Sequence, residues 1–153
     1  MAARTRAIAA AEQAGIRFTL HEYEHDPQTE SYGLEAAERL GLDPAAVFKT
    51  LVVDRDGALV VAIVPVASQL NLNALGKRTK LADRTKAERS TGYVLGGISP
   101  LGQKKQLPTV VDASAVERAT VHVSAGRRGL EIELDPRDLV RLTGADVKAI
   151  ARS

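Results

Sequence analysis

Two β-type runs joined by a tight turn constrain the fold of this chain more than any other feature. Residues 47–53 and 58–66 are rich in β-branched side chains, and Asp56 and Gly57 between them are typical of a two-residue hairpin turn. Apolar residues fall on both faces of each run. We therefore expect the two strands to pair and to be covered by other elements on both sides.

Helix-prone segments occur on both sides of this hairpin. They combine helix-favouring residues with a glycine that can end the helix in the left-handed conformation, or with a capping residue before the first turn. The predicted helical segments are residues 4–14 and 32–40, residues 72–91 with breaks at Gly76 and Asp83, and a tail that begins at residue 135 and breaks near Gly144. We therefore expect helices to alternate with strands along the chain.

Shorter strands are indicated where apolar and polar residues alternate. The segments with this pattern are residues 18–24, 109–112, 120–124 and 130–134. No internal repeat and no linker-like segment divides the chain. The sequence therefore predicts one compact α/β domain over residues 1–153, with a mixed sheet.

Composition excludes several classes of site. The 153 residues include no cysteine, which excludes a disulfide scaffold, a thiolate zinc site and a cysteine nucleophile. The 21 basic and 19 acidic side chains leave a net charge of only +2, so nucleic-acid binding requires a local basic patch. The longest apolar run, residues 58–67, is too short to span a bilayer, and no signal peptide is recognisable. We expect a cytoplasmic protein with no membrane contact.

Two sequence patterns imitate hydrolase motifs without meeting their structural requirements. Residues 21–25 read His-Glu-Tyr-Glu-His, but the local period of two and the following Pro27 predict a strand, in which the two histidines lie about 13 Å apart. Neither Ser99 nor Ser124 lies in a Gly-x-Ser-x-Gly sequence. The glycines of residues 96–102 fit no nucleotide-binding pattern, although such a loop can bring backbone N–H groups close to a ligand. The sequence therefore predicts neither a zinc protease nor a serine hydrolase.

Lys49 is the most informative polar residue, because it interrupts a run whose two faces are otherwise apolar. An unpaired ammonium buried there would cost several kcal/mol, so its charge must reach solvent, a carboxylate or a ligand. The alternative is a lysine at a strand end whose side chain extends to water. Three other polar residues on or beside predicted strands either line a cleft or lie on a solvated face, namely Tyr23, Ser124 and Glu131.

A basic region follows the hairpin. Between residues 76 and 89, two acidic residues accompany six basic ones, namely Lys77, Arg78, Lys80, Arg84, Lys86 and Arg89. Such a patch can bind phosphate groups, or it can be a solvated helix face. The chain has only 3 Tyr and 2 Phe and no Trp, so recognition of many stacked bases is not expected.

Longer stretches of the sequence carry a family resemblance. They are residues 21–27, 47–51, 90–105, 107–112 and 123–134. The most specific is the run Gly-Gly-Ile-Ser-Pro-Leu-Gly-Gln-Lys-Lys at residues 96–105. In these stretches the chain resembles the bacterial YbaK family of aminoacyl-tRNA deacylases, which are free-standing relatives of the editing domain inserted in some prolyl-tRNA synthetases.

The resemblance implies a compact α/β fold with a mixed, barrel-like sheet flanked by helices. It also implies a trans-editing hydrolase whose substrate is Cys-tRNA(Pro), that is, cysteine mischarged onto proline tRNA. Neither a metal nor a cofactor is implied. Prolyl-tRNA synthetase is the implied protein partner.

The resemblance extends to the residues of the site. Lys49, Gly97 and Ser99 are expected to be catalytic, with the Lys49 charge and backbone N–H groups near Gly97 stabilising the developing oxyanion. The residues expected to bind the aminoacyl group are Tyr23, Thr50, Gly96, Ile98, Pro100, Ser124 and Glu131. The residues expected to contact tRNA are Lys77, Arg78 and Lys80. Family members usually carry aspartate at the position of Glu131, so this carboxylate reaches one methylene further.

The implied nucleophile is the thiol of the substrate's own cysteine, which fits a chain with no cysteine and no convincing Ser–His pair. Two other functions stay open. One is a deacylase that removes another small amino acid, such as alanine, for which water or the tRNA 2′-hydroxyl must be the nucleophile. The other is a non-catalytic module that binds tRNA or a synthetase. Lys49 and the intact Gly-Gly-Ile-Ser-Pro run argue against the non-catalytic module.

Overall fold

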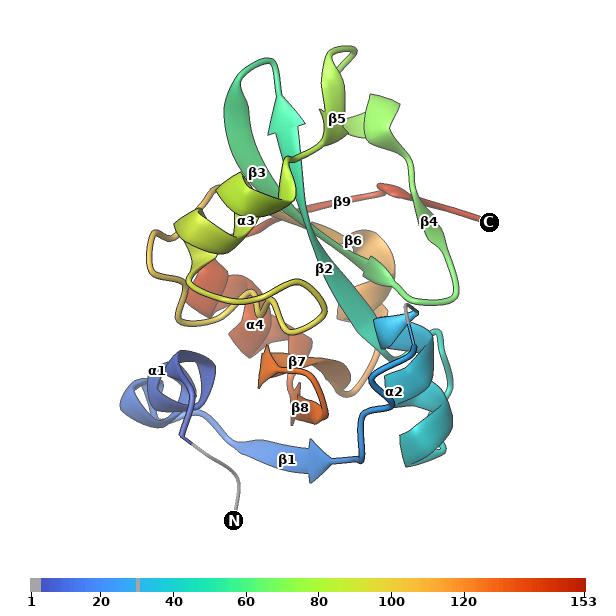
Figure 1. Ribbon diagram of the computed structural model, residues 1–153, viewed down its shortest axis with the longest axis vertical. Helices are drawn as coiled ribbons and strands as arrows, with labels where there is room; N and C mark the ends of the chain where they lie inside the picture. Colours follow the sequence, from blue (N-terminus) through green and yellow to red (C-terminus); the bar gives the residue numbers. More distant parts are fainter. Residues whose placement is uncertain (1–3, 30) are drawn as a thin grey trace.

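The computed structural model describes residues 4–29 and 31–153, and its larger sheet contains the predicted hairpin (Figure 1). The strand order is β5-β2-β3-β6-β9, antiparallel from β5 to β3 and parallel from β3 to β9. The bounds are Phe48–Arg55 (β2), Ala58–Pro65 (β3), Thr79–Leu81 (β5), Thr109–Asp112 (β6) and Asp146–Lys148 (β9). Asp56 and Gly57 turn the chain between β2 and β3 with positive φ angles of 53° and 96°, as the hairpin prediction requires.

A three-stranded antiparallel sheet lies below the larger one in Figure 1, in the order β1-β8-β7. A parallel bridge between Val47 and His122 connects this sheet to the residue that precedes β2. A separate two-stranded ribbon pairs β4 with β10. The bounds of these strands are Phe18–Glu22 (β1), Gln69–Leu70 (β4), Val121–Arg127 (β7), Leu130–Leu134 (β8) and Ala151–Arg152 (β10).

Side chains of the three-stranded sheet alternate between an apolar and a polar face. The apolar face packs into the main core and comprises Phe18, Leu20, Val121, Val123, Leu130, Ile132 and Leu134. The residues that we call the polar face are Thr19, His21, His122, Ser124, Glu131 and Glu133. His122 and Glu131 are nevertheless buried, with 5% and 6% exposure, so other elements cover part of the polar face as well.

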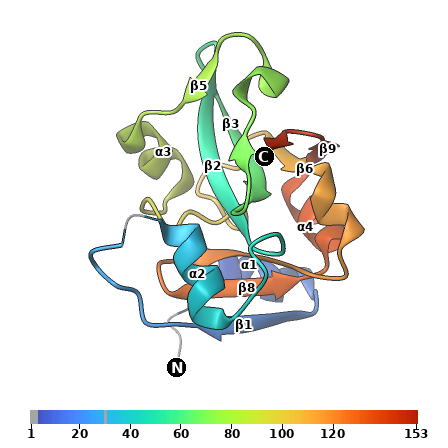
Figure 2. The ribbon, with the colours of Figure 1, turned by 90° about the vertical axis from the view of Figure 1, so that its right-hand side faces the viewer.

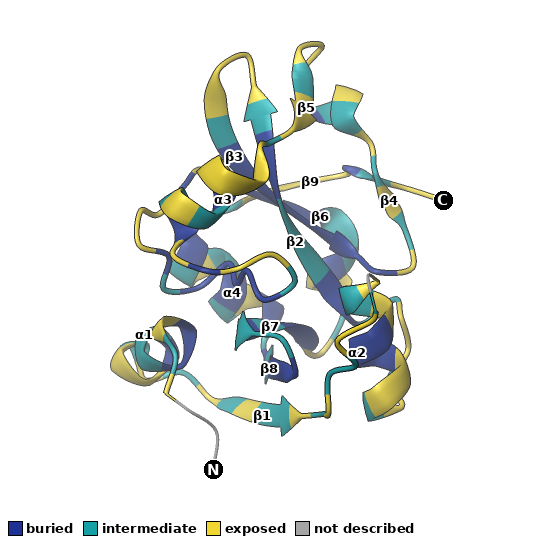
Figure 3. Ribbon diagram, viewed as in Figure 1, coloured by how far each residue is buried: buried dark blue, intermediate teal, exposed yellow. Residues whose placement is uncertain are grey.

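Helices cover both sheets. The bounds are Arg6–Ala14 (α1), Tyr32–Leu40 (α2), Arg84–Thr91 (α3) and Pro136–Thr143 (α4), with 3₁₀ helices at Leu72–Leu75 and Ala113–Glu117. The predicted helix ends at Gly15 and Gly41 are confirmed, since both glycines adopt left-handed φ angles of 68° and 67°. Figure 3 shows buried residues concentrated in the sheets, whereas α3 and the tip of the β2–β3 hairpin are largely exposed. Across the described residues, every helix is too short or too polar to cross a lipid bilayer.

The expected α/β fold with a mixed sheet is confirmed, but the sheets do not close into a barrel. The strands β5 and β9 lie at opposite ends of the five-stranded order and do not pair with one another. Both are only three residues long, so each offers few backbone groups for closure. The fold is therefore a pair of packed sheets with an additional short ribbon.

The breaks predicted at Gly76 and Asp83 within the helix-prone segment 72–91 are confirmed, since Gly76 follows the 3₁₀ helix and Asp83 caps α3, but residues 79–81 form a strand instead of a helix. Thr79–Leu81 pairs with β2, and α3 begins only after Asp83, whose side chain accepts a hydrogen bond from the N–H of Lys86. Residues in this segment are polar and helix-prone, but an available strand edge on β2 decides their conformation. Tertiary pairing thus overrides local helix preference here.

The predicted helix after Asp135 is α4, and the predicted break near Gly144 is confirmed, since Gly144 ends α4 in the left-handed conformation. After Gly144 the chain forms β9 and β10. The carboxylate of Asp112, at the end of β6, accepts hydrogen bonds from the N–H groups of Ile150 and Ala151, both at 2.9 Å. These contacts come from a residue more than thirty positions away, so no local pattern could have indicated them.

Gly102 packs against the backbone of α1 more closely than any side chain allows. Its φ is +62°, and a Cβ there would overlap the carbonyl oxygen of Arg6. Gly15 has nearly the same φ, +68°, but a Cβ there would meet nothing within 4 Å. A comparison of alanine substitutions at Gly15 and Gly102 therefore separates the cost of backbone strain from the cost of steric overlap.

We expect Gly102→Ala to lower the free energy of unfolding by about 1–3 kcal/mol more than Gly15→Ala does. Both substitutions carry the left-handed penalty of about 1–2 kcal/mol, and only the first adds the overlap with the Arg6 backbone. Urea unfolding of the two variants beside the parent chain measures this difference. Equal losses of unfolding free energy in the two variants would show that the loop after α3 can move away from α1 without cost.

Candidate active site

A cleft of about 310 Å³ opens between α2, the start of β2, the loop after α3 and the polar face. In Figure 2, α2 lies in front of β8 and near the start of β2, and residues of all three elements line the cleft. The predicted site residues that line the cleft are Tyr23, Lys49, Thr50, Gly96, Ile98, Ser124 and Glu131. Segments that are far apart in the sequence therefore converge on one cavity of a size typical for small ligands.

Lys49 enters the cleft from the second residue of β2 and is half-buried. Burial lowers the pKa of Lys49, and no neighbouring charge in the described part of the chain contributes to this shift. The ammonium group is thus not held by a structural carboxylate among those residues. Its positive charge is available to a ligand in the cleft.

Glu131 carries the acidic group of the cleft. It lies on the polar face, and burial raises the pKa of Glu131 to about 8. Tyr23 follows β1 directly, and its N–H donates to the carbonyl of Gly129 at 3.0 Å. Burial, and after it the charge of Glu131, raises the pKa of Tyr23 to about 12. The cleft therefore holds a carboxyl group that ionises more readily when a cation binds beside it.

Two of the hydroxyl groups that line the cleft belong to Thr50 and Ser124. Thr50 Oγ1 is buried and makes no hydrogen bond within residues 4–29 and 31–153. Ser124 Oγ accepts a hydrogen bond from the N–H of Gly126 at 3.2 Å, which leaves its own proton free to donate. A buried hydroxyl without a partner is costly, so the Thr50 group favours a polar ligand in this cleft.

Gly96 forms part of the mouth of the cleft beneath Tyr32 and Arg128. Its φ is +87°, and a Cβ there would lie 2.8 Å from Arg128 Nε and from the ring of Tyr32, so only glycine fits. The guanidinium of Arg128 stands 4.7 Å from the Tyr32 ring centroid, and its Nε donates to the Leu95 carbonyl at 2.8 Å. Arg128 thereby joins the β7–β8 turn, α2 and the loop after α3 into one wall.

The elements that build this cleft span most of the chain, and the same span matches a known family. Residues 26–142 match the model of the aminoacyl-tRNA editing domain. The chain belongs to the aminoacyl-tRNA editing domain family. This confirms the expected family and the expected class of enzyme, an aminoacyl-tRNA deacylase.

Individual relatives agree with the family match. This editing domain is 35% identical over 154 residues to EbsC of Enterococcus faecalis, a protein named as a candidate Cys-tRNA(Pro)/Cys-tRNA(Cys) deacylase, covering 96% of this chain and 93% of that protein. It is also 31% identical to a proline–tRNA ligase of Acidithiobacillus ferrooxidans, over 76% of this chain but 22% of the ligase. The match therefore corresponds to one part of a larger synthetase.

Solved structures share the fold of this editing domain. A crystal structure described as that of a hypothetical protein has a TM-score of 0.85 at 29% identity and covers 97% of this chain and 100% of its own. A second, described as a candidate trans-editing enzyme for prolyl-tRNA synthetase, also has a TM-score of 0.85, at 24% identity, with 97% and 96% coverage. The arrangement of helices and sheets is therefore shared with both of these structures.

Gly97 supports the cleft of the editing domain without lining it. Its N–H donates to the carbonyl of Val94 at 2.8 Å, so this group is engaged within the loop and does not face the cavity. A Cβ on Gly97 would lie 2.8 Å from Arg127 Cα, which shows how closely the loop packs on β7. The Gly97 N–H is thus engaged within the loop, and an oxyanion contact from the other backbone N–H groups near Gly97 stays a prediction.

Ser99 and Pro100 are likewise buried beneath the loop and do not line the cleft. Ser99 Oγ accepts a hydrogen bond from the N–H of Leu101 at 3.2 Å, and the Ser99 carbonyl accepts one from Gln103 Nε2 at 3.1 Å. Both contacts lie within the loop, and the expected catalytic role of Ser99 stays a prediction. The Ser99 hydrogen bonds fix the loop next to Ile98, which is buried and lines the cavity.

The predicted tRNA-contacting residues lie far from this cleft. Arg78 pairs with Asp56 at 3.5 Å, and Lys80 lies opposite Asp54, so the segment sits at the end of β2 that is remote from Lys49. At about 3.3 Å per residue along β2, the separation is about 20 Å. Lys77 belongs to the same exposed segment. A tRNA contact there stays a prediction.

The two histidines of the His-Glu-Tyr-Glu-His sequence have different partners. His21 lies on β1 and its Nε2 is 2.9 Å from Glu133 Oε1, whereas His25 follows the strand and its Nδ1 is 2.7 Å from Glu35 Oε1. The strand predicted for this segment is confirmed as far as Glu22. The sequence does not form the helical zinc-protease motif that it spells.

The first turn of α2 was not identified from the sequence as part of the site. Tyr32, Gly33 and Leu34 all line the cleft. Leu34 and Leu95 remain exposed, at 48% and 38%, and give the mouth an apolar rim. One sequence feature could have indicated this turn, because a glycine so near a helix start allows close packing, here against the side chain of Val66.

Proposed function

We propose that this editing domain hydrolyses Cys-tRNA(Pro) in the cytoplasm as a trans-editing enzyme. The observation that carries the proposal is a cleft with an ammonium, a buried carboxyl and free hydroxyl groups, but with no histidine or cysteine among its described lining residues. Such a cleft can bind and orient an aminoacyl ester, yet it offers no activated nucleophile of its own. The name of the Enterococcus faecalis relative supports the same substrate.

The carboxylate of Glu131 binds the α-ammonium group of the aminoacyl ester. Its raised pKa, about 8, reflects the cost of a buried charge without a partner, and a bound ammonium group removes that cost. The hydrogen bonds formed are charge-assisted and therefore stronger than neutral ones. Thr50 Oγ1, which has no other partner among the described residues, contributes a further hydrogen bond to the substrate.

The cysteine of the substrate supplies the nucleophile. Its sulfur forms a bond to the ester carbonyl carbon while the bond from that carbon to the ribose oxygen breaks, and the thiol proton passes to this departing oxygen, which leaves as the ribose hydroxyl. Water then opens the resulting thiolactone to free cysteine. The editing domain holds thiol and carbonyl in contact, and Lys49 stabilises the charge that develops on the carbonyl oxygen.

The rest of the tRNA lies outside the cleft. The exposed side chains of Leu34 and Leu95 offer an apolar contact to the terminal adenine. Lys77, Arg78 and Lys80 contact backbone phosphates further along the acceptor arm, which makes binding salt-dependent. Prolyl-tRNA synthetase acts beside this domain as the partner that selects the tRNA.

Release of cysteine from Cys-tRNA(Pro) by the Glu131→Gln variant tests this binding model. We expect KM to rise about 10- to 100-fold, because a hydrogen bond between two charged groups is lost. The free energy of unfolding should change by no more than about 1 kcal/mol. The reason is that burial alone raises the pKa of Glu131, with no contribution from a structural partner among the described residues.

Glu131→Asp is the matched control, because it keeps the charge and shortens the reach by one methylene. We expect its KM to lie between those of the parent chain and Glu131→Gln. A Glu131→Gln variant with the KM of the parent chain would show that Glu131 does not bind the substrate, whatever the effect on kcat.

A further inference from the structure

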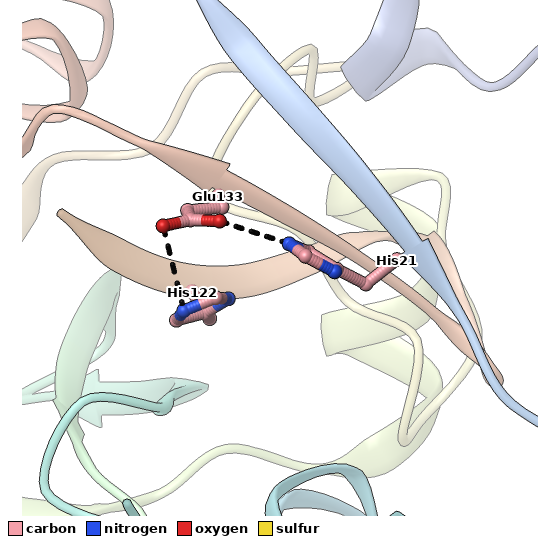
Figure 4. A group of neighbouring side chains, drawn as sticks. All are labelled: His21, His122 and Glu133. Carbon is pink, nitrogen blue, oxygen red and sulfur yellow. Dashed lines mark hydrogen bonds and ion pairs between the residues drawn. The ribbon is translucent and has the colours of Figure 1, made fainter. Parts of the chain in front are cut away.

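A second cluster of chemically active side chains lies on the polar face (Figure 4). It lies beside the cleft, since His21 pairs in register with Glu131, but none of its three residues lines the cavity. Glu133 on β8 lies directly opposite His122 on β7. His21 on β1 points to the same carboxylate from the other side of β8. Glu131 and Glu133 share a face of the sheet, because residues two apart on a strand do so. Glu131 lines the cleft, whereas Glu133 belongs to this cluster.

The distances within the cluster suit a small cation. His21 Nε2 lies 2.9 Å from Glu133 Oε1, and His122 Nε2 lies 3.9 Å from Glu133 Oε2. One ligand atom from each of the three residues lies within 4.8 Å of the others. Tetrahedral zinc with bonds of about 2.0–2.2 Å holds its ligand atoms about 3.3–3.6 Å apart. Small side-chain rotations would therefore bring all three atoms to bonding distance of one ion.

Burial and hydrogen bonding prepare these ligands. His122 is only 5% exposed, so burial restrains its ring, although its Nδ1 has no orienting hydrogen-bond partner in the described part of the chain. Thr120 Oγ1 donates to Glu133 Oε2 at 2.6 Å, which orients the carboxylate and leaves Oε1 directed at His21. His122 and Thr120 also line a groove, by which an ion and water can enter.

We propose that His21, His122 and Glu133 form a binding site for Zn²⁺ or a similar divalent transition ion. Two imidazoles and one carboxylate are a ligand set that zinc accepts, with the fourth position left to water from the groove. The ion joins β1, β7 and β8, so it stabilises the sheet that carries Ser124 and Glu131. It takes no part in ester hydrolysis, because none of its three ligands lines the cleft.

The chain provides its own control for this site. Of its three histidines, His25 is outside the cluster and pairs with Glu35 instead. A variant of His25 therefore removes one histidine without removing a proposed ligand. With no cysteine in the chain, thiolate binding cannot obscure the result.

Calorimetric titration of the chelator-stripped, untagged full chain with Zn²⁺ tests the proposal. We expect one ion per chain, with affinity weakened at least about tenfold by His122→Asn and by Glu133→Gln, and unchanged by His25→Asn. Zn²⁺ should raise the unfolding midpoint of the parent and His25→Asn chains, but not of the two ligand variants.

Co²⁺ provides a second readout, because its visible absorption intensifies in a four-coordinate site. We expect this band in the parent and in His25→Asn, and its loss in Glu133→Gln, which is nearly isosteric and keeps the fold if His122→Asn does not. The proposal is overturned if the parent chain binds no ion, or if binding survives both ligand variants. Equal loss in His25→Asn would show non-specific histidine binding and would overturn it too.

Discussion

Lys49→Ala is expected to abolish release of cysteine from Cys-tRNA(Pro), with kcat reduced at least about 100-fold. The ammonium group is half-buried in the cleft and faces no structural carboxylate among the described residues, so its charge is available to the substrate. Loss of one well-placed group that stabilises an oxyanion costs about 100- to 1,000-fold in kcat. Single-turnover deacylation with excess enzyme measures the effect directly.

Two further variants separate the charge of Lys49 from its packing. Lys49→Met keeps most of the side-chain length and should be as inactive as Lys49→Ala. Lys148→Ala is the matched lysine control, since its ammonium donates to the carbonyl of Ala74 at a sheet edge, and it should retain parental activity. Circular dichroism should show the same fold in all three. A Lys49→Ala chain with parental kcat would contradict the assigned role.

Exchange of the substrate thiol for a hydroxyl should have an effect of similar size. Ser-tRNA(Pro) differs from Cys-tRNA(Pro) by one atom, so it fits the same cleft and makes the same contact with Glu131. A hydroxyl is a much weaker nucleophile than a thiol at neutral pH, and the cleft offers no histidine among its described lining residues to activate it. We expect serine release at least about 100-fold slower than cysteine release under the same conditions.

The rate without enzyme is the reference for this comparison, because aminoacyl esters also hydrolyse in water. Serine release close to that rate supports attack by the substrate thiol. Enzymatic release of serine as fast as cysteine would show that water or the tRNA 2′-hydroxyl is the nucleophile. The cleft and its binding residues would then stand, but the thiol mechanism would not.

Local patterns were sufficient to predict the elements that carry the site. Alternation over residues 130–134 separated Glu131 from its apolar neighbours, and the apolar residues on either side of Lys49 marked its charge as unusual. The turn at Asp56 and Gly57 followed from residues that accept positive φ. Each of these features depends on near neighbours in the chain, so sequence reasoning could reach it.

The features that sequence reasoning missed depend on distant contacts. The tail strands depend on Asp112, and the strand within residues 72–91 depends on pairing with β2. Arg128 reaches across to Tyr32, and no pattern near either residue indicates that stacking. The motif at residues 96–105 identified the right loop but not which of its residues face the cavity, because a tight loop turns its backbone groups inward as well as outward.

Release of amino acid from Cys-tRNA(Pro), measured beside Ala-tRNA(Pro) and with Lys49→Ala as control, tests the central claim most directly. We predict rapid, Lys49-dependent loss of cysteine and little loss of alanine. Lys49-dependent loss of alanine instead would keep the fold and the cleft but move the function to another small amino acid. Tight binding of tRNA with no release from either substrate would contradict the account and leave a binding module in its place.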